Sequence, residues 1–212
     1  MCRLLFVKSE NEFIIEGHLN KFSIIAKNSK EFQGHGWGCS YLDNNNWIHY
    51  KNIKPIWDDD INQFGKTNRL IVHARSAFED KDIIVENNMP FFDDKYVFIF
   101  NGELRGVKIK ADGRIGAEKI FNFVKRFDSI GMKAALPKAI EIINKKSSYI
   151  RAMNIIITDK EKVYYSSLFN EDEDYFQMHY KQNGTELVIC SQVYPNETGW
   201  NKIDNNSSGV FK

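Results

Sequence analysis

Short apolar runs, separated by polar and turn-forming residues, dominate both ends of the chain. Each run is about four to seven residues long and rich in β-branched or aromatic residues, which is typical of strands. The runs that predict strands cover residues 4–7, 38–42, 47–50, 70–74, 96–100, 152–158, 163–168, 177–180 and 187–191. Asn183-Gly184 separates the last two runs and predicts a hairpin between them.

The middle of the chain has a different period. Apolar residues recur at helical spacing over residues 115–127 and 134–145, and more weakly over 18–27. Pro137 is expected in the first turn of its helix, where a missing N–H is harmless. Strands, then two helices, then more strands predict an α+β fold in which the helices cover mainly antiparallel sheets. Because no linker or repeat interrupts this pattern, residues 1–212 are expected to form a single domain.

The composition narrows the range of partners. With 42% hydrophobic and 14% aromatic residues, the chain of 212 residues can bury a well-packed core of its own. Lys and Arg number 29 against 28 Asp and Glu, and the resulting net charge of +1 argues against a protein that binds phosphate backbones. No nucleic-acid partner is therefore predicted, and the acidic cluster at residues 171–174 is expected to be a solvated loop.

The same survey predicts the compartment. No run approaches the roughly 18 consecutive apolar residues that a membrane span needs, and the first residues do not have the pattern of a signal peptide. The cysteines, Cys2, Cys39 and Cys190, are odd in number and widely spaced, so no disulfide framework is predicted. We therefore expect a reduced, cytoplasmic protein with no membrane partner.

Cys2 directly follows the initiator methionine. Removal of Met1 would leave a thiol and a free α-amine on one residue, and an amine with a pKa near ~8 can act as the base for the thiolate. A cysteine at this position can also be an incidental buried residue. Both interpretations stand at this point of the sequence.

Two further places can carry chemistry. Alternation along the strand at 70–74 puts His73 and Arg75 on one face, where the arginine either grips a carboxylate or lies at the surface. Asn101-Gly102 is either a type I′ hairpin turn or an oxyanion hole, in which the Asn amide and the Gly N–H point at a developing oxyanion. Trp37, between two glycines, is a core anchor or a pocket wall. The histidines show no metal-binding spacing, so neither a metal site nor a cofactor is predicted.

Five short motifs follow one another along the chain. They are Met1-Cys2-Arg3, Gly36-Trp37-Gly38, His73-Ala74-Arg75, Asn88-Met89-Pro90-Phe91 and Phe100-Asn101-Gly102-Glu103-Leu104. In this order they resemble the class II glutamine amidotransferases, and among these the stand-alone, single-domain branch. The resemblance implies the fold of the N-terminal-nucleophile hydrolases, a four-layer αββα sandwich of two mainly antiparallel sheets.

The resemblance also implies a site and an activity. Cys2 matches the nucleophile, and Asn101 and Gly102 match the oxyanion hole, with Gly102 beside the bound glutamine. Arg75 and Ser76 are expected to bind the substrate, Arg75 through the α-carboxylate. The implied reaction is hydrolysis of the γ-amide of glutamine or of a γ-glutamyl compound, which releases glutamate and ammonia or an amine. Either a separate synthase subunit accepts the ammonia, or the protein is a plain hydrolase.

Three positions depart from the family pattern. Phe78 stands where the family usually has Thr or Ser, Met89 where it has His, and Gly116 where it has the Asp that binds the substrate α-amino group. Because an unpaired ammonium is costly to bury, free glutamine is expected to bind weakly unless Asp112, Glu103 or a cluster of backbone groups replaces that Asp. The departures also favour an alternative function, that of a catalytically silent protein of the same fold that acts as a binding or regulatory subunit.

Overall fold

The first strand, β1 (Arg3–Ile14), is central to one of two units into which the chain divides. The computed structural model describes residues 1–211, apart from the side chain of Asp80. The first unit comprises Met1–Pro90 with Gln177–Ile203, and the second comprises Phe91–Phe176 with the described residues from Asp204 onward. Each unit contains one antiparallel sheet.

The first unit contains a seven-stranded sheet in the order β11-β9-β10-β1-β4-β2-β3. Besides β1, its strands are β2 (Trp37–Asp43), β3 (Asn46–Asn52), β4 (Lys66–Ala74), β9 (His179–Asn183), β10 (Glu186–Cys190) and β11 (Asn201–Lys202). Arg3 pairs with Ala74, so the start of β1 lies beside the end of β4. This register brings the N-terminus of the chain next to Arg75.

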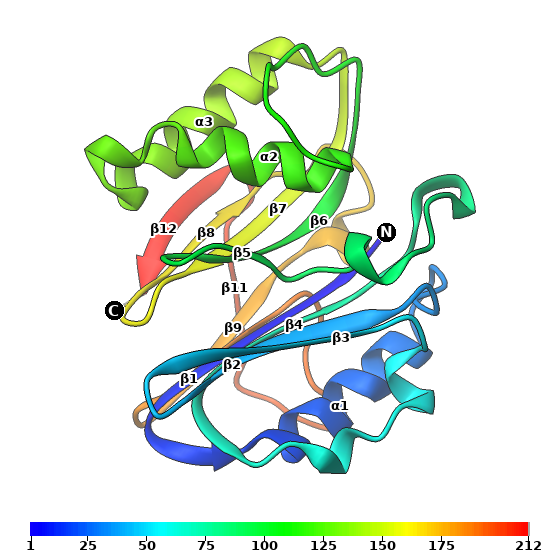
Figure 1. Ribbon diagram of the computed structural model, residues 1–212, viewed down its shortest axis with the longest axis vertical. Coiled ribbons are helices and arrows are strands. Elements are labelled where there is room, and N and C mark those ends of the chain that lie inside the picture. Colours follow the sequence, from blue (N-terminus) through cyan, green and yellow to red (C-terminus); the bar gives the residue numbers. More distant parts are fainter. Residues whose placement is uncertain (212) are drawn as a thin grey trace. The chain divides into compact units, whose positions relative to one another are not determined.

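Helix α1 (Ile15–Lys27) covers one face of this sheet (Figure 1). Leu5 of β1 and Val72 of β4 pack with Leu19 and Phe22 of the helix. Successive strand residues point to opposite faces, so Cys2 and Arg75 belong to the face away from α1. Short 3-10 helices lie in the connections: η1 (Ile56–Asp58), η2 (Ile61–Gln63), η3 (Phe78–Asp80) and η4 (Val85–Asn87).

The second unit contains a five-stranded sheet in the order β12-β8-β7-β6-β5. Its strands are β5 (Phe91–Phe92), β6 (Val97–Arg105), β7 (Tyr149–Thr158), β8 (Val163–Ser167) and β12 (Ser207–Phe211). The helices of this unit are α2 (Gly116–Lys125), α3 (Met132–Lys146) and α4 (Glu173–Phe176), with the 3-10 helix η5 (Asp128–Ile130). Helices α2 and α3 cover one face of the sheet (Figure 1). Phe98 stacks on Phe121 of α2 with ring centroids 5.0 Å apart, so Phe98 points to the helix face.

All the strands predicted from the sequence are confirmed, and so are both central helices and the weaker one at the start. The hairpin after Asn183 is also confirmed, because Asn183 pairs with Glu186 and Gly184 has a φ of 58°. Strands β5, β11 and β12 were not predicted. They are two residues long or mostly polar, so they carry no alternating pattern.

Two expectations are wrong. Helix α3 begins at Met132, so Pro137 lies inside it rather than in the first turn. The buried face extends one turn earlier than expected, through Met132, and Gly131 with its φ of 78° precedes the helix. The second concerns the acidic cluster, which is solvated as expected but is not a loop throughout, because helix α4 begins at Glu173. Asp172 forms an ion pair with Arg151 and accepts the first hydrogen bonds of α4 through its carbonyl oxygen.

Candidate active site

Cys2 lies just before β1, with its side chain only 8% exposed. The thiol donates a hydrogen bond to the carbonyl oxygen of Ser76, with Sγ and O 3.6 Å apart. Burial raises the pKa of the Cys2 thiol, while the N-terminal ammonium, the hydrogen bond to Ser76 and the Arg75 guanidinium act to lower it. The nucleophile predicted from the sequence therefore lies against the two residues predicted to bind substrate.

Arg75 follows the last residue of β4 and is 5% exposed. Its Nη2 donates to the carbonyl oxygen of Asp82 at 2.9 Å, and its Nη1 to Asn88 Oδ1 at 3.3 Å and to the carbonyl oxygen of Ile84 at 3.4 Å. Burial lowers the pKa of Arg75, against the nearby charges of Cys2 and Asp82. Among the described side chains, which exclude that of Asp80, no carboxylate forms an ion pair with this guanidinium. A buried cation held only by neutral oxygens is suited to an anionic ligand such as a carboxylate.

The backbone around Arg75 depends on Gly36. Gly36 has a φ of 103°, and a Cβ there would lie 2.1 Å from Asn88 Nδ2. Its carbonyl oxygen accepts a hydrogen bond from the Arg75 amide at 2.9 Å. Trp37, the next residue, is fully buried in the core and donates to Asp59 through its indole N–H, so it is a core anchor.

Asn101 and Gly102 lie in the middle of β6, where they pair with Asn154 and Met153 of β7. They therefore do not form a hairpin turn, which was one of the two interpretations of the dipeptide. Gly102 is required by packing, because a Cβ there would lie 2.1 Å from the carbonyl oxygen of Ala152.

The Asn101 side chain is fully buried, and neither its Oδ1 nor its Nδ2 has a hydrogen-bond partner among residues 1–211. Alternation from Phe98 puts Asn101 on the sheet face away from α2 and α3. Leaving a buried amide unpaired costs about 1–3 kcal/mol, so such a group is rarely kept for stability. An amide in this condition is suited to a ligand oxygen.

The predicted site residues thus gather in two groups. Cys2, Arg75 and Ser76 lie together in the first unit, and Asn101 and Gly102 lie together in the second. That the two groups act on one substrate remains a prediction.

The sequence did not single out Glu31 and Gln33. The ammonium of Met1 forms an ion pair with the Glu31 carboxylate. Gln33 is fully buried, and its Nε2 donates to the carbonyl oxygen of Met1 at 2.5 Å. Their sequence separation from Met1, about 30 residues in a polar segment, gave no signal of this contact.

The positions that depart from the family pattern have distinct surroundings. Gly116 is the first residue of α2, and a Cβ there would meet open space. The Glu103 carboxylate forms ion pairs with Arg105 and Arg151. Phe78 is 54% exposed, whereas Met89 is buried.

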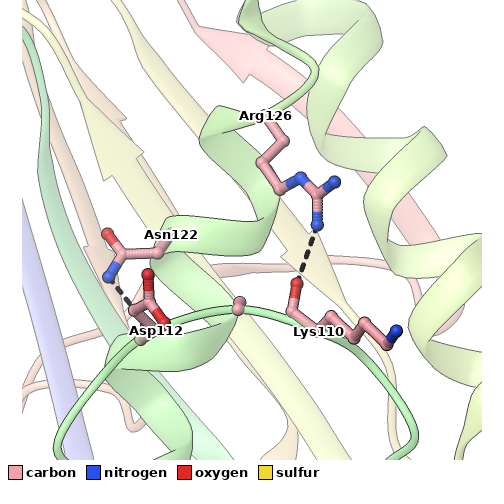
Figure 2. Close-up of a pocket in the computed structure, with 5 residues that line it drawn as sticks. Lys110, Asp112, Asn122 and Arg126 are labelled. Atoms are coloured by element: carbon pink, nitrogen blue, oxygen red, sulfur yellow. Dashed lines mark hydrogen bonds between the residues drawn. The ribbon is translucent and has the colours of Figure 1, made fainter.

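Asp112 lies in a separate hollow of about 420 Å³ against α2, lined by Lys110, Ala111, Asp112, Asn122 and Arg126 (Figure 2). Asn122 donates to the carbonyl oxygen of Asp112 at 2.9 Å, and Arg126 to that of Lys110 at 2.7 Å. These bonds tie the segment before α2 to the helix. The hollow contains none of the residues predicted to carry the reaction.

Within residues 1–211, no group of three or more His, Cys, Asp or Glu side chains is arranged to hold a metal ion. In the same range, none of the helices has the length and apolar character needed to cross a bilayer.

Solved structures share this fold. Glutamine phosphoribosylpyrophosphate amidotransferase from B. subtilis matches with a TM-score of 0.65 and 14% identity over 90% of this chain. A glutamine aminotransferase class-II domain protein from Silicibacter pomeroyi matches with a TM-score of 0.68 and 12% identity, covering 99% of this chain and 94% of its own. A predicted glutamine amidotransferase from Pseudomonas aeruginosa matches with a TM-score of 0.62 and 14% identity, covering 99% and 97%.

The comparisons confirm the expected α+β fold with two antiparallel sheets, which is the fold of these amidotransferase structures. The resemblance to class II glutamine amidotransferases is confirmed at the level of the fold. The chain spans 42% of the length of the B. subtilis enzyme that it matches. No family model and no curated protein sequence matches the chain.

Proposed function

We propose that the protein is an amide hydrolase in which Cys2 is the N-terminal nucleophile, with residues 1–212 acting as a single amidotransferase-type domain. Its substrate is the γ-amide of glutamine or of a γ-glutamyl compound. The observation that carries the proposal is the contact of the Cys2 thiol with the Ser76 carbonyl, beside a buried Arg75 that donates its hydrogen bonds to neutral oxygens. A nucleophile next to a guanidinium held by neutral oxygens suits a substrate with an amide at one end and a carboxylate at the other.

In the proposed reaction, the α-amine of Cys2 takes the thiol proton and the thiolate attacks the γ-carbonyl carbon. The C–N bond of the tetrahedral intermediate then breaks, and the α-ammonium gives its proton to the departing nitrogen. Water hydrolyses the resulting thioester to the γ-carboxylate and regenerates the thiol. One amide and one water thus yield glutamate and ammonia, or glutamate and an amine.

Asn101 and Gly102 are proposed to stabilise the oxyanion of the tetrahedral intermediate. The unpaired amide of Asn101 supplies one N–H donor, and the backbone of Gly102 supplies the other. Donors of this kind act best when they are fixed before the charge develops, and β6 pairs with β7 on both sides of Asn101. No metal or organic cofactor takes part in this scheme.

The proposal requires removal of Met1, because the base is the free α-amine of Cys2. The test is the intact mass of the purified protein after incubation with a glutamine analogue that carries an electrophilic ketone in place of the amide. We expect one covalent adduct, on a chain that begins at Cys2, and none on Cys2→Ala. An adduct on a chain that keeps Met1, or an equal adduct on Cys2→Ala, would overturn the mechanism.

One observation favours the silent alternative. In the chain that carries Met1, burial raises the pKa of the Cys2 thiol, which leaves it protonated and unreactive. A protein that kept Met1 would act as a binding or regulatory subunit of the same fold. The mass of the N-terminus in the purified protein separates the two functions.

The product suggests what the protein works with, and its free cysteines suggest the compartment in which it works. Ammonia is either consumed by a separate synthase subunit or released as a product of plain hydrolysis. Cys2, Cys39 and Cys190 are all free thiols. Free thiols suit a reducing compartment, and we propose that the protein works in the cytoplasm.

A further inference from the structure

Two side chains hold the first residue of the chain, and we call them the residue-1 clamp: the carboxylate of Glu31 and the amide of Gln33. The Glu31 carboxylate forms an ion pair with the Met1 ammonium, and Gln33 Nε2 donates to the Met1 carbonyl oxygen at 2.5 Å. Gln33 is itself fixed, because Nε2 also donates to the carbonyl oxygen of Glu31 at 2.7 Å. These contacts of the clamp are to main-chain atoms of Met1, so they do not depend on the methionine side chain.

Covalent geometry places the nitrogen of Cys2 close to the residue-1 clamp. The Met1 carbonyl oxygen and the Cys2 nitrogen are joined by a C=O and a C–N bond, so Gln33 Nε2 lies at most about 5 Å from the Cys2 nitrogen. The Met1 nitrogen lies three bonds from the Cys2 nitrogen, at most about 4 Å away. Removal of Met1 thus moves the terminal ammonium by less than the reach of the partly exposed Glu31 side chain.

We propose that Glu31 and Gln33 are positioning residues that hold the α-amino group of mature Cys2. Once Met1 is removed, Glu31 binds the ammonium of Cys2 in place of that of Met1. The Met1 carbonyl oxygen to which Gln33 Nε2 donates is then gone, and Gln33 accepts from the ammonium through Oε1, which fixes the direction of the amine relative to Sγ. This inference rests on the proposed function in one respect, that Cys2 becomes the first residue.

The charges around the amine give the clamp an electrostatic effect. Glu31, Arg75 and the terminal ammonium all act on the Cys2 thiol, so they lie within electrostatic reach of one another. Arg3 is also adjacent, but its guanidinium donates to Ser29 Oγ and to the carbonyl oxygen of Ser191. The negative charge of Glu31 attracts the ammonium, and the two groups form an ion pair in the chain that carries Met1.

The test uses chains that are produced with Cys2 as the first residue by cleavage of an N-terminal fusion. The pKa of the α-amine is measured from the pH dependence of its acetylation, read by mass spectrometry with the thiol blocked reversibly. Glu31→Gln should lower this pKa by about one unit, and should shift the acidic limb of kcat/KM to lower pH by the same amount. Glu10→Gln, an exposed acid on β1, is the matched control and should shift neither.

Gln33→Leu tests the second member of the clamp. It keeps the volume of the side chain but cannot bond to the amine, so kcat should fall about tenfold or more with KM unchanged. Thermal unfolding of each variant shows whether the fold is kept, and Gln33→Glu, which keeps an acceptor at this place, should restore part of kcat.

The outcomes separate the clamp from the proposed function. A lowered amine pKa in Glu31→Gln with no amidase activity in any chain would support the clamp and refute the amide hydrolase. An amine pKa equal to that of Glu10→Gln would overturn the clamp. A raised KM for glutamine in Glu31→Gln with an unchanged amine pKa would also overturn it, and would assign Glu31 to the substrate ammonium instead.

Discussion

Arg75 in the first unit and Asn101 in the second are both buried polar side chains, but only Arg75 has partners. The guanidinium makes three hydrogen bonds to neutral oxygens, whereas both polar atoms of the Asn101 amide are unpaired among residues 1–211. The first arrangement contributes to stability and leaves a net positive charge for a ligand. The second costs stability, and its benefit has to come from a ligand or a reaction.

Asn154 sharpens the comparison, because it pairs with Asn101 on the neighbouring strand and is also fully buried. Its Nδ2 donates to the carbonyl oxygen of Phe176 at 2.7 Å, and its Oδ1 accepts from the Leu168 amide at 3.2 Å. Two asparagines on adjacent strands of one sheet therefore differ in hydrogen bonding: the amide of Asn154 is paired and that of Asn101 is not. Residue type and burial do not separate a structural amide from a functional one, but hydrogen-bond partners do.

The largest expected effect is that of Cys2→Ala. Loss of the nucleophile should lower kcat by on the order of 10⁴-fold or more. The free energy of unfolding should change by less than about 1 kcal/mol, because the thiol makes one weak hydrogen bond and the replacement is small. Glutamate release and urea unfolding measure the two quantities. Full activity in this variant would place the nucleophile elsewhere.

Asn101→Ala should mainly lower kcat, whereas Asn154→Ala should mainly lower the free energy of unfolding. Without its amide, Asn101→Ala should lose about 10²–10³ in kcat, and its free energy of unfolding should stay within about 1 kcal/mol of wild type. Asn154→Ala should instead lose about 1–3 kcal/mol for each backbone group that it leaves unpaired. Steady-state kinetics and denaturant unfolding on both variants provide the measurement. Equal losses of stability would show that Asn101 has a partner after all.

Arg75→Ala should act on substrate binding. If the guanidinium holds the α-carboxylate equally in the ground and transition states, KM should rise about 10–100-fold with kcat nearly unchanged. Stability should fall as well, because the segment from Asp82 to Asn88 loses its bonds to the side chain. Arg75→Lys keeps the charge without the planar fork and should be intermediate in KM. A lower kcat at constant KM would contradict a binding role.

The smallest expected effect is a gain from Gly116→Asp. Its Cβ would enter open space at the start of α2, where a carboxylate also stabilises the helix by about 0.3–1 kcal/mol. If the site lacks a partner for the substrate ammonium, kcat/KM for glutamine should rise about tenfold, the value of about one charge-assisted hydrogen bond. Gly116→Asn, of the same shape without the charge, is the control. A wild type that already binds glutamine tightly would show that another group fills this role.

The sequence by itself determined the elements and their class. Alternating and helical periods are local properties, so the longer strands of both sheets and the helices α2 and α3 could be predicted before any contact was known. The strands β5, β11 and β12 could not, because they carry no alternating pattern. The order of short motifs also indicated Cys2, Arg75, Ser76, Asn101 and Gly102 as site residues. The motifs indicate which side chains are able to carry out the chemistry, because that ability depends on the type of residue.

Only the tertiary structure decided which groups meet and which are left unpaired. The pairing of β1 with β4 brings Cys2 against Ser76 and Arg75, and the residue-1 clamp reaches the N-terminus from about 30 residues away. The Asn101-Gly102 dipeptide was ambiguous locally, and pairing with β7 shows that it lies within a strand. These facts depend on hydrogen bonds between residues distant in sequence. A hydrogen-bond partner, or its absence, is a property of the folded neighbourhood, which no local pattern encodes.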